Sequence, residues 1–285
     1  MWAGAVPHFL KLKYPMVLID ILGLGDSAKP MDASAYRYKQ QADSICQILN
    51  HEGVESPIIP IGHDWWPAYQ IPSSEPFDLD AANKSTAGRF GYAQWEYWNF
   101  FCAPDAPKLQ DEDLSRMYEV NHGVYPSNVP EENGRDIWMR EMFCTQGAMR
   151  EYVAKQGKYK DFTVDLKPYA KNPELKKRFI ERMKKDSFAA PDNYYHSLKD
   201  NHNLEDERKL SGKDKEITVP LLYIGQTGDW VCRTDLMSDA KEAGLIKAGI
   251  EEKVVNAGHW FLYEIPDELA DLVIEWLEKH YPVKG

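Results

Sequence analysis

The chain has 285 residues, of which 43% are hydrophobic, and its formal net charge is -11. This length suits one large domain or one domain with an inserted lid, and no apolar stretch reaches the roughly 18 residues that a membrane span needs. The negative charge excludes a protein that binds nucleic acid through a basic surface, and no secretory signal is recognisable, so we expect a cytoplasmic protein.

Metal and cofactor motifs are not found in the sequence. No histidine pair has H-E-x-x-H spacing. Gly23-x-Gly25 follows a predicted strand, but the third glycine of a dinucleotide loop is missing. We therefore predict no metal, no cofactor and ordinary reduced thiols. The four cysteines, none in a C-x-x-C arrangement, are Cys46, Cys102, Cys144 and Cys232.

The first part of the chain alternates predicted strands and helices. Residues 2–12 predict a short helix, and the apolar runs 15–20 and 57–61 have the length of buried parallel strands. Between these runs, residues 38–50 carry apolar side chains at helical spacing. The sequence therefore predicts a strand, helix, strand unit that ends at Asp64.

Asp64 follows the second predicted strand directly, between His63 and Trp65. A strand-to-helix turn at this point would expose its side chain, as the G-x-S-x-G turn exposes a nucleophilic serine. Because Asp replaces Ser, a serine esterase is excluded. The alternative is that Asp64 only ends a strand and begins a turn.

Residues 72–211 differ from the rest in composition, with aromatic clusters and charges at helical spacing and no strand-like runs. Amphipathic helices are predicted at 137–156 and 173–189. Strand patterns resume only afterwards. The elements predicted in this last part are strands at 219–225 and 252–256 and helices at 234–248 and 266–280.

Asp229 and His259 each follow one of these later strands. Because parallel strands end at one edge of a sheet, Asp64, Asp229 and His259 are expected to lie close together. Asp64 would attack a saturated carbon and form an alkyl ester, and His259, oriented by Asp229, would activate the water that hydrolyses the ester. The alternative for His259 is a helix-cap or core histidine.

The chain resembles the alpha/beta hydrolase superfamily, in the branch of epoxide hydrolases and related haloalkane dehalogenases. The resemblance rests on Gly62-His-Asp-Trp65, on residues 20–30 and 90–101, and on the order nucleophile, acid, histidine. It implies an α/β fold with a reduced parallel sheet of about four strands and an inserted helical lid. The implied parts are the first half of the core (1–71), the lid (72–211) and the second half of the core (212–285).

The resemblance also implies roles for lid residues. Opening an epoxide needs a proton donor, and epoxide hydrolases supply two lid tyrosines, which correspond here to Tyr92 and Tyr195, with Tyr97 competing with Tyr92. The expected substrates are a small hydrophobic epoxide and water. A haloalkane or haloacid dehalogenase with the same triad is the alternative, in which Trp65 and Trp98 would bind the halide.

Some segments of the family pattern have no counterpart in the sequence. These are the first strands with their His-Gly-x-Pro loop, the helix after the nucleophile, and the central strands that flank 57–61. Without the flanking strands, backbone groups of 57–61 would be unpaired. The carboxylate of Asp64 would keep one oxyanion donor, the backbone N–H of Trp65, and lose the other. A third alternative is therefore an incomplete, catalytically impaired family member.

Overall fold

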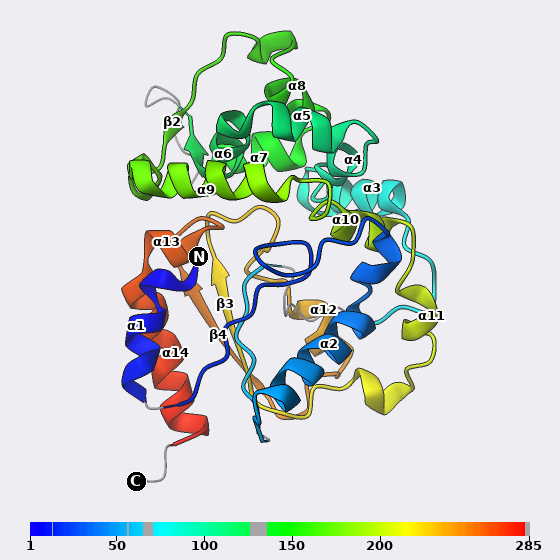
Figure 1. Ribbon diagram of the computed structural model, residues 1–285. Helices are drawn as coiled ribbons and strands as arrows, with labels where there is room; N and C mark the ends of the chain where they lie inside the picture. Colours follow the sequence, from blue (N-terminus) through cyan, green and yellow to red (C-terminus); the bar gives the residue numbers. More distant parts are fainter. Residues whose placement is uncertain (13, 56, 65–70, 126–135, 283–285) are drawn as a thin grey trace.

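The computed structural model describes residues 1–12, 14–55, 57–64, 71–125 and 136–282 (Figure 1). The helices are α1 (Val6–Phe9), α2 (Tyr38–His51), α3 (Leu79–Phe90), α4 (Trp98–Phe101), α5 (Ala106–Glu112), α6 (Leu114–His122), α7 (Ile137–Cys144), α8 (Ala148–Val153), α9 (Pro173–Asp186), α10 (Asn193–Lys199), α11 (Leu204–Glu207), α12 (Ser238–Glu242), α13 (Phe261–Glu264) and α14 (Pro266–His280). The strands are β1 (Gly123–Val124), β2 (Asp165–Leu166), β3 (Leu221–Gln226) and β4 (Ile250–Val255).

The core is built on β3 and β4, which pair in parallel from Leu221 opposite Ile250 to Gln226 opposite Val255. In Figure 1, α1 and α14 lie on one side of this pair, and α2 and α12 lie on the other. Helix α14 packs against the core because its apolar residues recur every three or four positions. Its buried residues are Leu269, Ala270, Val273, Trp276 and Leu277.

The strands predicted at 15–20 and 57–61 are wrong, because both segments are irregular. Leu18 is 64% exposed and Ile58 is 48% exposed, whereas buried strand residues were expected. A central strand is stable only when neighbouring strands satisfy its N–H and C=O groups. Within the described residues no strand pairs with either segment. The parallel sheet therefore has two of the four strands that we predicted.

Other predicted elements agree with the structure. Helix α2 confirms the helix at 38–50, and α14 begins and ends where a helix was predicted. Strands β3 and β4 confirm the strands at 219–225 and 252–256.

Three of the longer predicted helices are shorter or divided. The helix predicted at 137–156 is divided into α7 and α8, since Gly147, the N-cap residue before α8, has φ of 71°. The helix predicted at 173–189 ends with α9 at Asp186, because Ser187 has φ of 61°, outside the helical region. Of the predicted helix 234–248, α12 forms only the middle part, and Gly244 with φ of 67° follows it. Glycine and left-handed residues thus set these boundaries.

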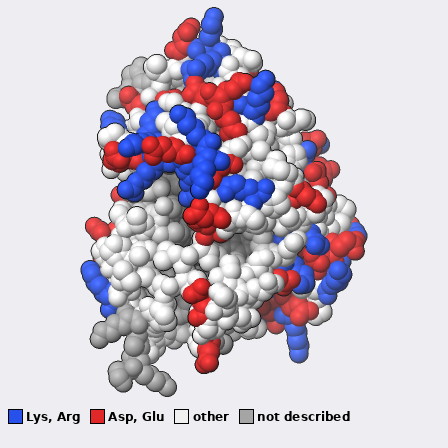
Figure 2. All heavy atoms as spheres, in the orientation of Figure 1, with Lys and Arg blue, Asp and Glu red and all other residues white. Residues whose placement is uncertain are grey.

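Helices α3 to α9 form a helical layer above the core, drawn in cyan and green in Figure 1. Its aromatic core continues into Trp230 and Val231, which belong to the loop after β3. The layer is therefore joined to the core by hydrophobic packing. Figure 2 shows that charged side chains gather on the outside of this layer, while the middle of the visible core face is largely uncharged.

None of the described helices is long and apolar enough to cross a membrane.

Trp138 is central to the helical layer and is 1% exposed. Its ring stacks on Phe162 at 5.8 Å, and its Nε1 donates to the carbonyl of Glu119 at 2.8 Å. We expect Trp138→Ala to lower the free energy of unfolding by about 3–5 kcal/mol, through lost burial and the cavity left behind. Denaturant unfolding measures this loss. Leu10→Ala is the control, because Leu10 is 61% exposed, and a Trp138 effect as small as that of Leu10 would contradict the packing described.

Candidate active site

The loops that follow β3 and β4 stay in contact beyond the ends of the strands. The N–H of Thr227 donates to the carbonyl of Val255, and the N–H of Gly228 donates to that of Ala257 at 2.9 Å. A side chain at Gly228 would have its Cβ 2.8 Å from the Ala257 oxygen, so only glycine permits this approach. The close approach brings together the next residues of the two loops, Asp229 and His259.

Asp229 and His259 form a buried hydrogen-bonded pair. Nδ1 of His259 lies 2.7 Å from Oδ2 of Asp229, whose side chain is fully buried. The other oxygen of Asp229 accepts the backbone N–H groups of Val231 and Cys232, both at 2.8 Å. These bonds fix the carboxylate, which in turn orients the ring of His259 by accepting a hydrogen bond from its Nδ1.

Asp64 completes the arrangement from the first part of the chain. Its Oδ2 lies 3.6 Å from Nε2 of His259. Its backbone has φ of 65°, in the left-handed region that few residues other than Gly, Asn and Asp adopt. A turn with this backbone conformation exposes the side chain at its apex, as does the strained turn that carries the nucleophile in hydrolases. The structure thus brings together all three predicted residues of the triad.

The electrostatics of the site favour a charged imidazole. Burial alone would lower the pKa of His259, but the carboxylates of Asp229 and Asp64 outweigh burial and hold this pKa well above its ordinary value. The resting site therefore pairs an imidazolium with the carboxylate of Asp64. Removing the charge of Asp64 would bring the pKa of His259 down.

His63 is a further residue of the site, for which no separate role was predicted. Its Nε2 donates to the backbone carbonyl of His259 at 2.7 Å. Burial, reinforced by the charge of His259, lowers the pKa of His63 to about 4, so its ring is neutral. This bond ties the residue before Asp64 to the backbone of the histidine, and its place in the Gly-His-Asp segment was the only signal for it.

Cys232 also lies in the site and was not predicted there. Its thiol contacts Oδ1 of Asp64 at 3.8 Å. Burial and the charge of Asp229 raise the pKa of this thiol to about 12, so it is a neutral, weak donor. Among the described residues, Asp229, Cys232 and His259 form a group with donor atoms within 4.8 Å of one another. We do not interpret this group as a metal site, because its side chains already contact one another or Asp64: His259 contacts Asp229, and Cys232 contacts Asp64.

Two tyrosines from the helical side adjoin each other near Asp64. Tyr97 and Tyr195 meet edge to face with ring centroids 5.7 Å apart. Burial, followed by the neighbouring Tyr195 and Asp64, raises the pKa of Tyr97 well above its ordinary value. Tyr97 therefore holds its proton, as a proton donor must before the reaction.

Tyr92 lies in different surroundings. Its hydroxyl donates to the carbonyl of Trp230 at 2.9 Å and accepts a hydrogen bond from Arg233 at 3.0 Å. These contacts attach the helical layer to the loop that carries Asp229. Of the two tyrosines that competed in the sequence, Tyr97 is the one that adjoins Tyr195.

Of the two tryptophans predicted to bind substrate, Trp98 belongs to the aromatic core of the helical layer. Trp98 is 3% exposed and packs against Tyr195 with ring centroids 5.8 Å apart. Trp65 lies outside the described residues.

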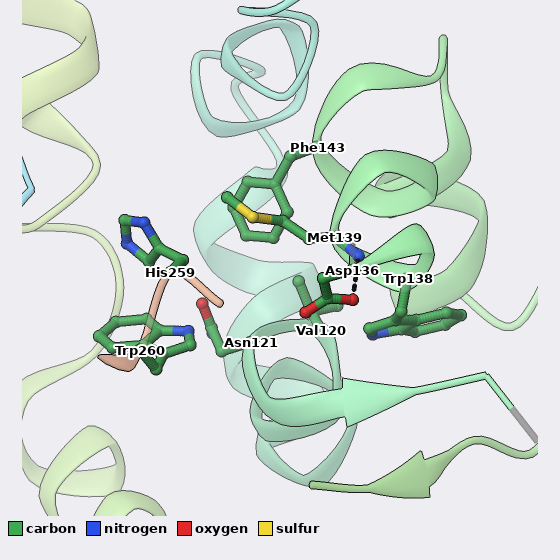
Figure 3. A pocket seen from close by; sticks show the side chains of 8 residues that line it. All are labelled: Val120, Asn121, Asp136, Trp138, Met139, Phe143, His259 and Trp260. Carbon is green, nitrogen blue, oxygen red and sulfur yellow. Dashed lines mark hydrogen bonds between the residues drawn. The ribbon is translucent and has the colours of Figure 1, made fainter. Parts of the chain in front are cut away.

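A small pocket separates the histidine from the helical layer (Figure 3). His259 and Trp260 form one wall, and Asp136 and Asn121 contribute to the opposite one. Its volume is about 10 Å³, roughly the room that one water molecule requires. The other lining residues are Val120, Trp138, Met139 and Phe143.

Known proteins resemble this chain in sequence and in fold. No family profile matches the chain. The chain is 22% identical over 298 residues to bifunctional epoxide hydrolase 2 of Rattus norvegicus, with 97% of this chain and 49% of that protein covered. It is 22% identical over 325 residues to epoxide hydrolase B of Mycobacterium tuberculosis, with 97% and 87% covered. The chain thus spans about half the length of its mammalian relatives.

Solved structures agree in fold over nearly the whole chain. An epoxide hydrolase from an endophytic Streptomyces has a TM-score of 0.68 at 22% identity, with 97% of this chain and 84% of that chain covered. Epoxide hydrolase A from Mycobacterium thermoresistibile has a TM-score of 0.68 at 18% identity, with 97% and 86% covered. The chain is thus similar to epoxide hydrolases in sequence at 22% identity and, over nearly its whole length, in fold.

The structure is therefore similar in fold to these epoxide hydrolases, and its described residues form few strands and many helices. Its alignment with the Mycobacterium tuberculosis protein extends over 325 positions, more than the 285 residues of this chain. The bacterial epoxide hydrolase therefore has residues without a counterpart here. This agrees with the prediction that segments of the family pattern are missing.

Proposed function

We propose that the protein hydrolyses a small hydrophobic epoxide to a diol through an alkyl ester on Asp64. The observation that carries this proposal is the contact of 3.6 Å between Oδ2 of Asp64 and Nε2 of His259, with Asp229 holding the other ring nitrogen at 2.7 Å. A carboxylate in the nucleophile position acts at a saturated carbon and forms an ester that a base must then help to hydrolyse.

In the first step an oxygen of Asp64 attacks an epoxide carbon and the ring C–O bond breaks. The alkoxide that leaves takes a proton from a tyrosine hydroxyl. We assign this role to Tyr97 and Tyr195, which adjoin each other on the helical side. In this proposal residues 72–211 act as the lid that carries these donors over the nucleophile.

In the second step His259 takes a proton from water, and the hydroxide attacks the ester carbonyl of Asp64. The ester C–O bond breaks, and the diol leaves after protonation. Over the whole cycle, one proton of the water ends on the diol oxygen released from the ester, and the other makes up for the proton that the tyrosine donated. Esterification removes the negative charge of Asp64, so the pKa of His259 falls and the imidazolium releases its Nε2 proton, which can restore the tyrosine hydroxyl. The neutral ring can then accept a proton from water.

A test of the substrate class compares two products from the purified protein. With styrene oxide we expect phenylethanediol to form, and with brominated or chlorinated alkanes we expect no halide release. Halide release without diol formation would favour the dehalogenase alternative, in which Trp98 and Trp65 bind the leaving group.

Replacing either tyrosine by phenylalanine tests the donor assignment. We expect Tyr97→Phe and Tyr195→Phe each to lower turnover of styrene oxide on the order of 10²-fold, because the alkoxide loses a proton donor. Tyr92→Phe is the comparison, and its hydroxyl contacts Trp230 and Arg233. A loss confined to Tyr92→Phe would reverse the assignment of the donor.

A catalytically impaired protein is the second candidate, and the irregular segments 15–20 and 57–61 favour it. These segments expose apolar side chains that a complete sheet would cover. A cooperative thermal transition together with turnover of styrene oxide would reject this candidate. A broad transition without turnover would support it.

A further inference from the structure

Lys167 lies buried between two carboxylates at the boundary of the helical layer and the core. It follows β2, and its Nζ is 2.7 Å from Oδ2 of Asp136 and 2.9 Å from Oε1 of Glu264. Only 12% of its side chain is exposed. Burial alone would lower the pKa of Lys167, but the two carboxylates outweigh burial and raise it. Lys167 is therefore a buried cation that both partners stabilise.

The two carboxylates belong to different parts of the molecule. Asp136 caps the N-terminus of α7 in the helical layer, where its Oδ1 accepts the N–H of Met139 at 3.0 Å. Glu264 is the last residue of α13, which directly follows the histidine loop in the core. The ion pairs of Lys167 thus join the helical layer to the core.

Glu264 also holds the backbone of the histidine loop. Its Oε2 accepts the N–H of Gly258 at 2.9 Å, and Gly258 directly precedes His259. A Cβ at Gly258 would lie 2.4 Å from Nζ of Lys167 and 2.8 Å from Oε1 of Glu264. This backbone therefore rests directly on the ion-pair cluster, and a Cβ at Gly258 would displace the side-chain ends of Lys167 and Glu264.

Aromatic rings support the same boundary beside this cluster. Tyr169 from the helical layer stacks on Tyr263 of α13 with ring centroids 5.3 Å apart. His122 at the end of α6 contacts the ring of Trp260 at 5.2 Å. Since Trp260 follows His259, contacts from the helical layer reach the chain on both sides of the histidine.

We propose that Lys167 is a positioning residue, which orients His259 through Glu264 and Gly258 and makes this orientation depend on the docked helical layer. The inference rests on the proposed function and deepens it. His259 does its work as a base in the second step, whereas Asp64 performs the first. A disturbance of the histidine loop should therefore slow hydrolysis of the ester and leave its formation unchanged.

The test separates the two steps by rapid acid quench and intact-mass measurement of the protein with styrene oxide. We expect Lys167→Met to form the ester at a rate close to that of the unmodified protein. Its hydrolysis should be slower by roughly 10- to 100-fold, because small misplacements of a catalytic group have effects of this size. Lys167→Arg, which keeps the charge, should restore much of the rate.

Lys158→Met is the matched control. Lys158 pairs with Glu141 at 2.5 Å in the helical layer, and its side chain is 65% exposed. Ester hydrolysis at the normal rate in Lys167→Met would overturn the proposal, as would an equal slowing in Lys158→Met. If Lys167→Met does not fold, Glu264→Gln decides: slow ester hydrolysis supports the proposal, and a normal rate overturns it.

An NMR measurement tests the role of Lys167 without relying on the proposed function. The proton between His259 and Asp229 should give a downfield NMR signal in the free protein, which needs no substrate. We expect Lys167→Met to shift this signal and Lys158→Met to leave it in place. If the unmodified protein forms no ester, the proposed function fails, and the shift of this signal still supports or overturns the role of Lys167.

Discussion

If Asp64 is the nucleophile, as proposed, replacing it with asparagine is expected to lower the turnover of styrene oxide by about 10⁴-fold or more, as removal of a catalytic nucleophile does in a serine protease. The amide is a poor nucleophile toward a saturated carbon and forms no stable alkyl ester. The variant should therefore show neither diol in a turnover assay nor added mass after an acid quench.

The fold should tolerate this change, so loss of activity can be attributed to chemistry. Asparagine adopts the left-handed backbone about as readily as aspartate, and Asp64 has φ of 65°. Asp26→Asn is the control, because the Asp26 side chain is 91% exposed. Diol formation by the Asp64 variant at the rate of this control would exclude Asp64 as the nucleophile.

Much of the candidate site could be predicted from the sequence, for a physical reason. Asp229 and His259 lie in the short loops that follow two apolar runs, and the two runs pair in parallel as β3 and β4. Parallel pairing brings the carboxyl ends of the strands to one edge, so residues that follow these ends meet. Asp64 could be predicted because a short Gly-His-Asp segment encodes its turn locally.

The irregular segments show that a local apolar pattern does not determine whether a strand forms. An apolar run predicts burial, but whether it becomes a strand depends on partners elsewhere in the chain. Residues 15–20 and 57–61 have strand-like sequences and are irregular. No counterpart of the flanking strands is recognisable in the sequence, so unpaired backbone groups at 57–61 were expected, and this segment is irregular where a strand was predicted.

Contacts between segments far apart in the chain could not be predicted from local sequence patterns. Tyr92 and Tyr97 are five residues apart in one aromatic segment, and only packing distinguishes the one beside Tyr195 from the one bonded to Trp230. Lys167 is one lysine among many in the sequence. Its importance comes from Glu264, which lies 97 positions away in the chain.

Replacing His259 with glutamine is expected to trap the alkyl ester. Asp64 can still attack the epoxide, because the first step uses the carboxylate and a tyrosine proton. Hydrolysis then lacks its base and should slow by roughly 10²- to 10⁴-fold. After one turnover the protein should carry one added styrene oxide per chain, detectable by intact mass, while steady-state diol formation falls by the same factor as ester hydrolysis.

The position of the added mass distinguishes this mechanism from simple damage to the site. Peptide mapping should find the adduct on Asp64, and none on Cys232, although its thiol is only 3.8 Å from the carboxylate. The high pKa of Cys232, raised to about 12 by burial and by Asp229, keeps the thiol protonated and a poor nucleophile. An adduct on Cys232 in place of Asp64 would contradict the assignment of the carboxylate as nucleophile. With Asp229→Asn we expect the same ester to accumulate to a smaller extent, because His259 is present and only its orientation and charge stabilisation are lost.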